Sequence, residues 1–106
     1  MRNTRKRRVI WDSGVNDRMK RAVEDSLRHG NYFFTEDTVE FWNTRIVAGM
    51  FPNDTFVTSE DNYNRTKILY TARRYDWDTH DVETIGGFQQ FTTAEEATLF
   101  AKYYEE

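Results

Sequence analysis

Three polar side chains near residue 80 have the types and the spacing of a metal site. Asp76, Asp78 and His80 alternate along the chain, so an extended strand would place all three on one face. Carboxylate oxygens and imidazole nitrogens can together bind a divalent cation. Residues 78–81 also suit a hairpin tip, where short polar side chains bond to the backbone. No second histidine or carboxylate pair elsewhere completes a recognisable ligand set, so we expect a turn here and no metal.

The other groups that could take part in catalysis have structural explanations. His29 precedes Gly30 at the expected end of a helix, where a cation interacts favourably with the helix dipole. No serine lies in a setting typical of a nucleophile. The pair Gly86-Gly87 falls between strand residues and does not open a helix, as a phosphate-binding loop would. We therefore expect a non-enzymatic protein without a cofactor.

Charge is distributed unevenly along the chain. Residues 1–8 carry five positive side chains and no negative one, whereas the other 98 residues carry ten positive and all eighteen negative side chains, a net charge of −8. A basic segment of this kind can neutralise phosphates and give salt-dependent affinity for nucleic acid. One functional hypothesis is therefore a small nucleic-acid-binding protein. The residues that would carry this binding are Arg5, Lys6, Arg7 and Arg8.

The acidic remainder of the chain favours a different function. A domain with net negative charge can dock onto basic surfaces of other proteins, and exposed aromatic side chains can anchor such an interface. The chain has eight Phe, six Tyr and three Trp, which is more than a small core needs. Our first hypothesis is that the protein binds and modulates a host or defence protein. The contact residues that we expect on the surface of the sheet are Arg73, Arg74, Tyr75 and Trp77.

The apolar pattern predicts an α+β fold with the order α-α-β-β-β-α. Helices are expected over residues 15–29, 36–48 and 93–105, since apolar side chains recur there at helical spacing. Strands are expected over residues 55–59, 67–77 and 82–91. These strands would form a three-stranded antiparallel meander that buries one face under the helices and leaves the other open. Phe41 and Trp42 of the second helix are expected in the core.

Chain length and composition indicate one domain. We expect residues 1–8 to form a basic, flexible arm and residues 9–106 to form a single α+β domain. The chain has no cysteine, which favours a reducing compartment, and no apolar run long enough to span a membrane. We therefore expect a cytoplasmic protein, in the cytoplasm of a host cell. Pairing of two chains through an exposed sheet edge is compatible with both functional hypotheses.

Two stretches of sequence resemble a known family. Tyr32-Phe33-Phe34-Thr35, followed by a helix that ends near Asn43-Thr44-Arg45-Ile46, resembles the opening of small uncharacterised proteins from actinobacterial phages and plasmids. Gly87-Phe88-Gln89-Gln90-Phe91 resembles the C-terminal half of the same family. The resemblance covers residues 31–102 and implies a phage origin, but it assigns no functional residue.

The order α-β-β-β-α also matches the double-stranded-RNA-binding domain, although residues 93–96 are acidic where that family is basic.

Overall fold

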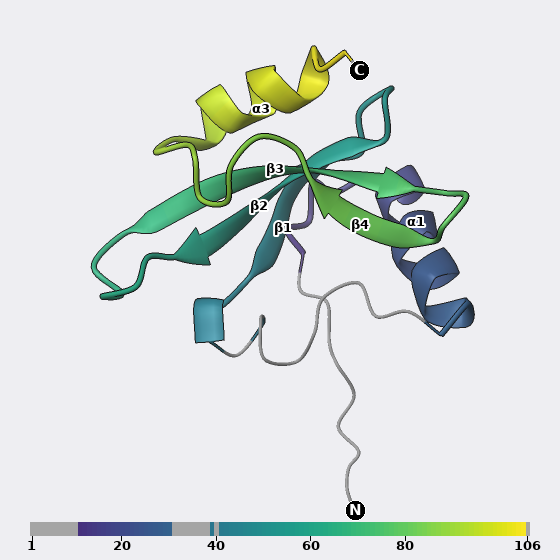
Figure 1. Ribbon diagram of the computed structural model, residues 1–106, viewed down its shortest axis with the longest axis horizontal. Helices are drawn as coiled ribbons and strands as arrows, with labels where there is room; N and C mark the ends of the chain where they lie inside the picture. Colours follow the sequence, from purple (N-terminus) through teal and green to yellow (C-terminus); the bar gives the residue numbers. More distant parts are fainter. Residues whose placement is uncertain (1–10, 31–38, 40, 106) are drawn as a thin grey trace, which may run out of the picture.

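The computed structural model describes residues 11–30, 39 and 41–105 and shows an α+β fold (Figure 1). Its sheet consists of four antiparallel strands in the order β1-β2-β3-β4, and not three as the sequence pattern predicted. Each strand pairs with its neighbour in the sequence. The elements in chain order are α1 (Asp17–Arg28), β1 (Arg45–Gly49), β2 (Thr55–Asp61), β3 (Ile68–Asp76), β4 (Asp81–Thr84) and α3 (Ala94–Lys102).

The strand that the sequence did not predict is β1. It occupies the end of the stretch for which the sequence predicted a helix. Val39, Phe41 and Trp42 have helical backbone, but Asn43 has a φ of +56°, a conformation that ends helices. The β-branched Ile46 and Val47 then follow in extended conformation, which suits their stiff side chains. The predicted helix over residues 36–48 is therefore wrong from Asn43 onward.

The two long helices cover opposite faces of the sheet (Figure 1). Phe56 and Val57 are neighbours in β2 and point to opposite faces, because side chains alternate along a strand. Phe56 packs with Met19, Ala22 and other residues of α1. Val57 packs in a second core cluster with Ala97 and Ala101 of α3. The prediction that one face of the sheet stays open is therefore wrong.

Both helices begin at side-chain caps. The side-chain oxygen of Asn16 accepts a hydrogen bond from the backbone N–H of Met19, and this cap starts α1 at Asp17, shortly after the predicted start at residue 15. Gly30 follows α1 with a φ of +82°, as expected for a glycine after the last turn. The Thr93 hydroxyl accepts from the backbone N–H of Glu96 and begins α3.

The last predicted strand is shorter than the sequence pattern indicated. β4 ends at Thr84, and the chain then bends at Gly86 and Gln89, which have φ values of +77° and +58°. It returns to the sheet at Phe91, which exchanges two backbone hydrogen bonds with Tyr70 of β3. Gly86, with its positive φ, thus permits a loop that leaves the sheet after β4 and returns at Phe91.

The N-terminal residues and the absence of a membrane-spanning segment were also predicted. The predicted arm, residues 1–8, and with it Arg5, Lys6, Arg7 and Arg8, lies outside the described residues. Within the part of the chain that the structure describes, no helix combines the length and the apolar composition needed to cross a bilayer.

Candidate functional site

The four predicted contact residues lie on β3 and just after it, and they differ in exposure. Tyr75 is fully buried and Arg73 is 8% exposed, so the expectation that both lie on the surface is wrong. Trp77 packs at the edge of the first core cluster, edge-on to the Tyr75 ring. Arg74 is half-buried and pairs with Glu83 of β4. Successive strand residues point to opposite faces, so the four side chains form no single surface.

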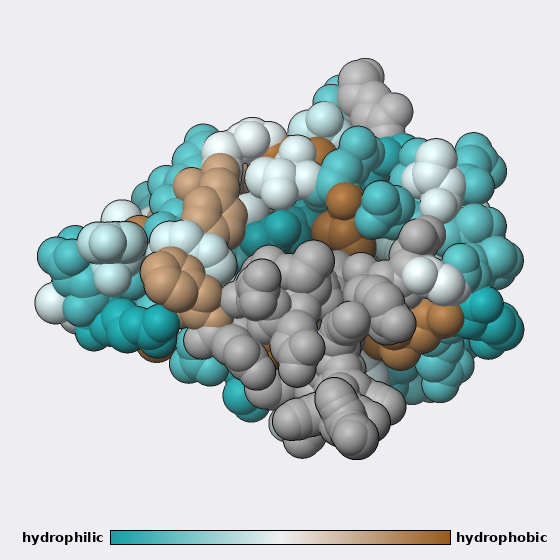
Figure 2. Space-filling model, turned by 60° about the horizontal axis from the view of Figure 1, so that its bottom comes forward, coloured by the Kyte–Doolittle hydropathy of each residue, from teal (hydrophilic) through white to brown (hydrophobic). Residues whose placement is uncertain are grey.

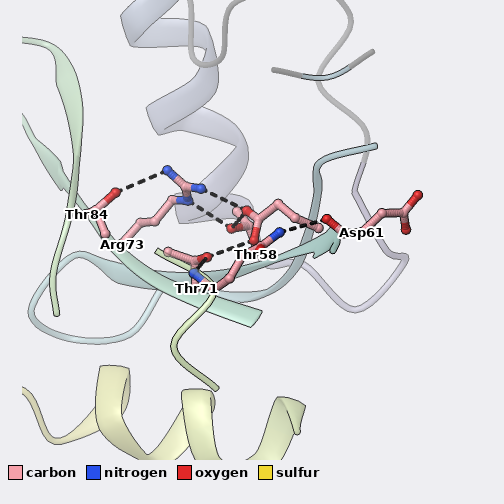
Figure 3. Close-up of polar contacts among 7 residues, drawn as sticks. Thr58, Asp61, Thr71, Arg73 and Thr84 are labelled. Atoms are coloured by element: carbon pink, nitrogen blue, oxygen red, sulfur yellow. Dashed lines mark hydrogen bonds and ion pairs between the residues drawn. The ribbon is translucent and has the colours of Figure 1, made fainter. Parts of the chain in front are cut away.

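Arg73 belongs to a buried polar network on one face of the sheet (Figure 3). Its Nη2 lies 2.8 Å from Oε2 of Glu60, and its Nε donates to the Thr58 hydroxyl over 2.8 Å. Thr58 and Thr71 donate to the two carboxylate oxygens of Glu60 over 2.6 and 2.7 Å. Thr84 accepts a longer bond from Nη1 of Arg73. Every charged group of the network therefore has partners inside the sheet.

The network ties the loop after β4 to the sheet. Gln89 donates its backbone N–H to the Thr71 hydroxyl over 2.9 Å and its side-chain amide to the carbonyl of Asp61 over 2.7 Å. The Glu60 side chain is fully buried. A fully buried carboxylate that accepts from an arginine and two hydroxyls is enclosed away from any substrate, so we interpret the network as structural.

Arg74 lies beside an open, polar hollow at one end of the sheet. The hollow has a volume of about 460 Å³ and is lined by Pro52, Asn53, Asp54, Arg74 and Glu105. Of these residues, Asp54 pairs with Arg18 of α1, whose Nη2 lies 2.6 Å from Oδ1 of Asp54. Asp54 and Arg74 each form an ion pair with a residue outside the lining, and the described residues that line the hollow form no convergent cluster typical of a catalytic site.

Aromatic side chains meet at the surface in a place that the sequence prediction missed. We call Phe41, Trp42, Tyr63 and Phe88 the aromatic cluster. Phe41 packs edge-on against Trp42, and Trp42 lies edge-on to Phe88, with ring centroids 4.6 and 5.4 Å apart. Tyr63 adjoins Phe41 at 6.5 Å. Phe41 and Phe88 are both 46% exposed and Tyr63 is 78% exposed, and hydrophobic side chains reach the surface among hydrophilic ones on the face drawn in Figure 2.

The aromatic cluster joins three segments that are far apart in the sequence. Phe41 and Trp42 precede β1, Tyr63 lies in the turn between β2 and β3, and Phe88 lies in the loop after β4. Arg65 lies over the Phe41 ring, 5.4 Å from its centroid, and also contacts the Asp61 carboxylate. Helical spacing suggested that Phe41 belongs to the core. That prediction is wrong, because β1 replaces the second half of the helix that would have buried it.

The alternating side chains of Asp76, Asp78 and His80 do not converge, because the Asp76 carboxylate faces the backbone of the turn. Oδ1 of Asp76 accepts from the N–H groups of Asp78 and Thr79, which holds the pKa of the Asp76 carboxyl below its usual value. The expected hairpin tip over residues 78–81 is therefore a turn, as predicted. His80 instead points toward α1, where its Nδ1 lies 2.7 Å from Oδ2 of Asp25.

Asp25 is thus a functional candidate that the sequence analysis did not identify. Its carboxylate accepts from His80 and from the Tyr75 hydroxyl at 2.8 Å, and these bonds hold the pKa of Asp25 below its usual value. Burial, together with the Asp25 carboxylate, raises the pKa of the Tyr75 hydroxyl well above 10. His29 of the same helix stacks on His80 with ring centroids 3.5 Å apart. Nothing in the local sequence signals this convergence, because α1 and the turn before β4 are about fifty residues apart.

Comparison with known proteins identifies one relationship. The model of a family of unknown function (DUF7447) matches residues 18–102. The match begins inside α1, so the shared part of the family includes most of the first helix, whereas the sequence resemblance covered only residues 31–102. No curated protein and no solved structure matches the chain.

Proposed function

This chain belongs to that family of unknown function, and we propose that it is a non-enzymatic accessory protein that binds and modulates another protein. The partner that we propose is a host or defence protein in the cytoplasm of a host cell. The assignment to a phage or another mobile element rests on the two stretches of sequence that resemble phage proteins. The aromatic cluster is the observation that carries the binding function.

Aromatic rings that contact one another and remain exposed leave apolar surface in water, which is unfavourable in free energy unless a partner covers it. Aromatic side chains supply most of the energy in protein interfaces, where they are enriched near the centre. In the aromatic cluster, Tyr63, Phe41 and Phe88 leave much of their surface in water although each contacts another ring. Arg65, stacked over Phe41, adds a side chain type that is also enriched in interfaces.

The charge of the chain supports a partner with a basic surface. Outside residues 1–8 the net charge is −8, and such a field speeds the approach of an oppositely charged protein. Among the acidic residues, Glu24, Glu83 and Glu95 are exposed on α1, β4 and α3. We assign affinity to the aromatic cluster and long-range attraction to these acids, so association with the partner slows when salt is added.

The test has two stages. Full-length protein is used to capture a stoichiometric partner from host lysate, and the affinity for that partner is then measured with single variants. Tyr63 lies in an exposed turn, so the substitution Tyr63→Ala leaves the core intact. We expect it to weaken binding at least tenfold, as truncation of an interface anchor does.

Tyr103→Ala is the matched control. Tyr103 is 68% exposed at the end of α3 and belongs to the other face of the molecule, so its truncation should leave the affinity unchanged. The proposal is abandoned if no stoichiometric partner is captured, or if Tyr63→Ala and Tyr103→Ala bind the partner as tightly as the unaltered chain.

The alternative function is nucleic-acid binding through Arg5, Lys6, Arg7 and Arg8. The observation that favours it is the concentration of positive charge in residues 1–8. Two findings weigh against an extension of this surface onto the fold. The fourth strand removes the match in element order to the double-stranded-RNA-binding domain, and Glu95 and Glu96 in the first turn of α3 would repel phosphate.

Deletion of residues 1–8 separates the two functions. Duplex binding is measured at two salt concentrations for the full-length and the shortened chain. Nucleic-acid binding through these residues requires affinity that falls steeply with salt and disappears with the deletion. Absence of salt-dependent binding by the full-length chain at low salt eliminates the alternative.

A further inference from the structure

We propose that Asp25, His29 and His80 form a binding site for a divalent transition-metal ion such as Zn²⁺. The chain has only two histidines, one at the C-terminal cap of α1 and one in the turn before β4, and the fold brings both to the same carboxylate. A ligand atom from each of the three residues lies within 4.8 Å of the others. This inference concerns a site separate from the aromatic cluster and does not depend on the proposed protein partner.

The local structure positions each of the three ligands. Asp25 and His29 are one turn apart at the C-terminal end of α1, so their side chains lie on one face of the helix. His80 has a φ of +62° and its backbone N–H bonds to the carbonyl of Asp76, which turns the side chain back toward the helix. The two imidazole rings are nearly parallel, at 8°, and 3.5 Å apart. Both rings lie beside the Asp25 carboxylate, with Nδ1 of His80 2.7 Å from Oδ2 and Nδ1 of His29 3.6 Å from Oδ1.

Further hydrogen bonds orient the ligands as in known metal sites. The Tyr75 hydroxyl, on a fully buried side chain, donates to Oδ2 of Asp25 over 2.8 Å and fixes the carboxylate. Nδ1 of His29 lies 2.9 Å from the backbone carbonyl of Asp25. In the tautomer that donates this bond, Nε2 of His29 carries the lone pair that binds a metal. Such outer contacts are the usual companions of metal-bound histidines and carboxylates.

The ligand set selects the kind of ion. Imidazole nitrogen with one carboxylate suits Zn²⁺, Ni²⁺, Cu²⁺ or Fe²⁺, whereas Mg²⁺ and Ca²⁺ prefer oxygen ligands alone. Donors of a tetrahedral zinc site lie about 3.4 Å apart, given bonds of about 2.0–2.1 Å. The ligand atoms, which lie within 4.8 Å of one another, must therefore approach by up to about 1.4 Å when an ion binds. His29 is 45% exposed, so a fourth position stays open to water.

The guanidinium of Arg28 would compete with the metal ion for the Asp25 carboxylate. Nη2 of Arg28 lies 3.8 Å from Oδ1 of Asp25, and the Arg28 side chain is 66% exposed and free to move away. A metal ion at the site replaces this weak pair with direct bonds. Substitution of Arg28 should therefore leave metal affinity unchanged or raise it.

The bound ion would connect two parts of the chain that only the native fold brings together. Because the unfolded chain separates α1 from the β3–β4 turn, the ion binds the folded state in preference. At a free ion concentration one hundred times the dissociation constant, the ratio of folded to unfolded chains rises about 100-fold. Zinc should therefore raise the melting temperature, and magnesium should not.

Calorimetric titration of the untagged, full-length protein with ZnCl₂ at neutral pH tests the proposal. We expect one ion per chain and a dissociation constant on the order of micromolar or below. Co²⁺ in place of Zn²⁺ should give the visible absorption of a site with nitrogen ligands. MgCl₂ serves as the negative control for both measurements.

Single substitutions identify the ligands. His29→Gln removes a half-exposed ring that makes no core contact, so this variant folds, and we expect its zinc affinity to fall at least tenfold. His80→Gln should show the same loss. Asp78→Asn is the matched control from the same turn, since the Asp78 side chain is exposed and lies outside the ligand set, and its affinity should match that of the unaltered chain.

Three results would overturn the assignment. One is the absence of a zinc-dependent heat or melting shift. The second is unaltered affinity in both histidine variants, which would mean that zinc binds elsewhere on the surface. The third is loss of affinity in Asp78→Asn with retention in His29→Gln, which would point to a site within the turn alone.

Discussion

At the scale of single residues, the Glu60–Arg73 pair shows how charge is accommodated inside this small sheet. Both side chains are almost fully enclosed, and their charges are met by the hydroxyls of Thr58 and Thr71. Removing both charges from such a pair can leave stability nearly unchanged, whereas removing one leaves the other buried without a partner. The sequence placed Arg73 in a strand, but it ended the preceding strand at residue 59, before Glu60, and it did not predict the pairing across β2 and β3.

Arg73→Met should lower the free energy of unfolding by about 3–5 kcal/mol, because the Glu60 carboxylate then stays buried without its counter-ion. Chemical denaturation at neutral pH measures this change. The double variant Glu60→Gln with Arg73→Met should lose less than the sum of the two single variants. Arg45→Met removes an exposed pair with Asp12 and serves as a control, with an expected loss of about 1 kcal/mol or less. Equal losses in Arg73→Met and Arg45→Met would contradict the structural role of the network.

Acid sensitivity has an identifiable source in the turn after β3. The N–H groups of Asp78 and Thr79 lower the pKa of the Asp76 carboxyl below the ordinary value of 3.8. A carboxyl with a lowered pKa in the folded state contributes stability at higher pH, and this contribution is lost as pH falls below 3.8. Asp76→Asn keeps the acceptor oxygen but does not titrate, so its unfolding free energy should fall less between pH 5 and pH 2. Denaturant titrations at several pH values check this, and parallel pH profiles for the two proteins would refute it.

At the scale of elements, the sequence predicted the two end helices and the strands β2 and β3 well, and it predicted residues 43–49 and 85–91 poorly. The face of α3 with Ala97 and Ala101 packs on the sheet as its spacing indicates. Residues 45–49 were misassigned because Ile46 and Val47 also fit a helical stripe, and only the turn at Asn43 distinguishes the two readings. The loop after β4 was misassigned as a strand because Ile85 and Phe91 both pack on the sheet, although the residues between them leave it.

The aromatic cluster and the histidine pair escaped prediction for a related reason. Their members come from segments that only the tertiary fold brings together, such as Tyr63 and Phe88, or His29 and His80. Spacing along the chain reports neighbours on one helix or one strand face, and it carries no information about such distant partners.

The junction of β1 and β2 depends on a glycine. Gly49 has a φ of +131°, a conformation that other residues rarely adopt, and a Cβ atom at this position would lie 2.5 Å from Cβ of Phe56. Gly49→Ala should therefore lower the free energy of unfolding by about 1–3 kcal/mol from backbone strain alone. Thermal and chemical unfolding measure the loss. Gly14→Ala is the control, because a Cβ there meets no atom within 4 Å, and similar stability of the two variants would contradict the argument.

At the scale of the whole molecule, a four-stranded sheet separates two core clusters. One contains Met19, Phe56 and Tyr75 under α1, and the other contains Val57, Ala72 and Ala101 under α3. The class of the fold follows from the sequence, since alternating segments and amphipathic helices are visible in it. The two-sided arrangement does not, because it depends on which face of β2 each helix covers.

Tyr75 closes the first core cluster, and its place late in the chain has a consequence for synthesis on the ribosome. The apolar face of α1 emerges early, but the side chains that bury it arrive with β1, β2 and finally β3. A nascent chain that ends before Tyr75 therefore exposes this face, and it is open to chaperones or proteases until about fifty further residues have been made. Stalled nascent chains of increasing length should become resistant to protease only after residue 75 has left the exit tunnel. Protease resistance of α1 in shorter chains would contradict this order, since it would mean that the apolar face of the helix is buried before β3 has been made.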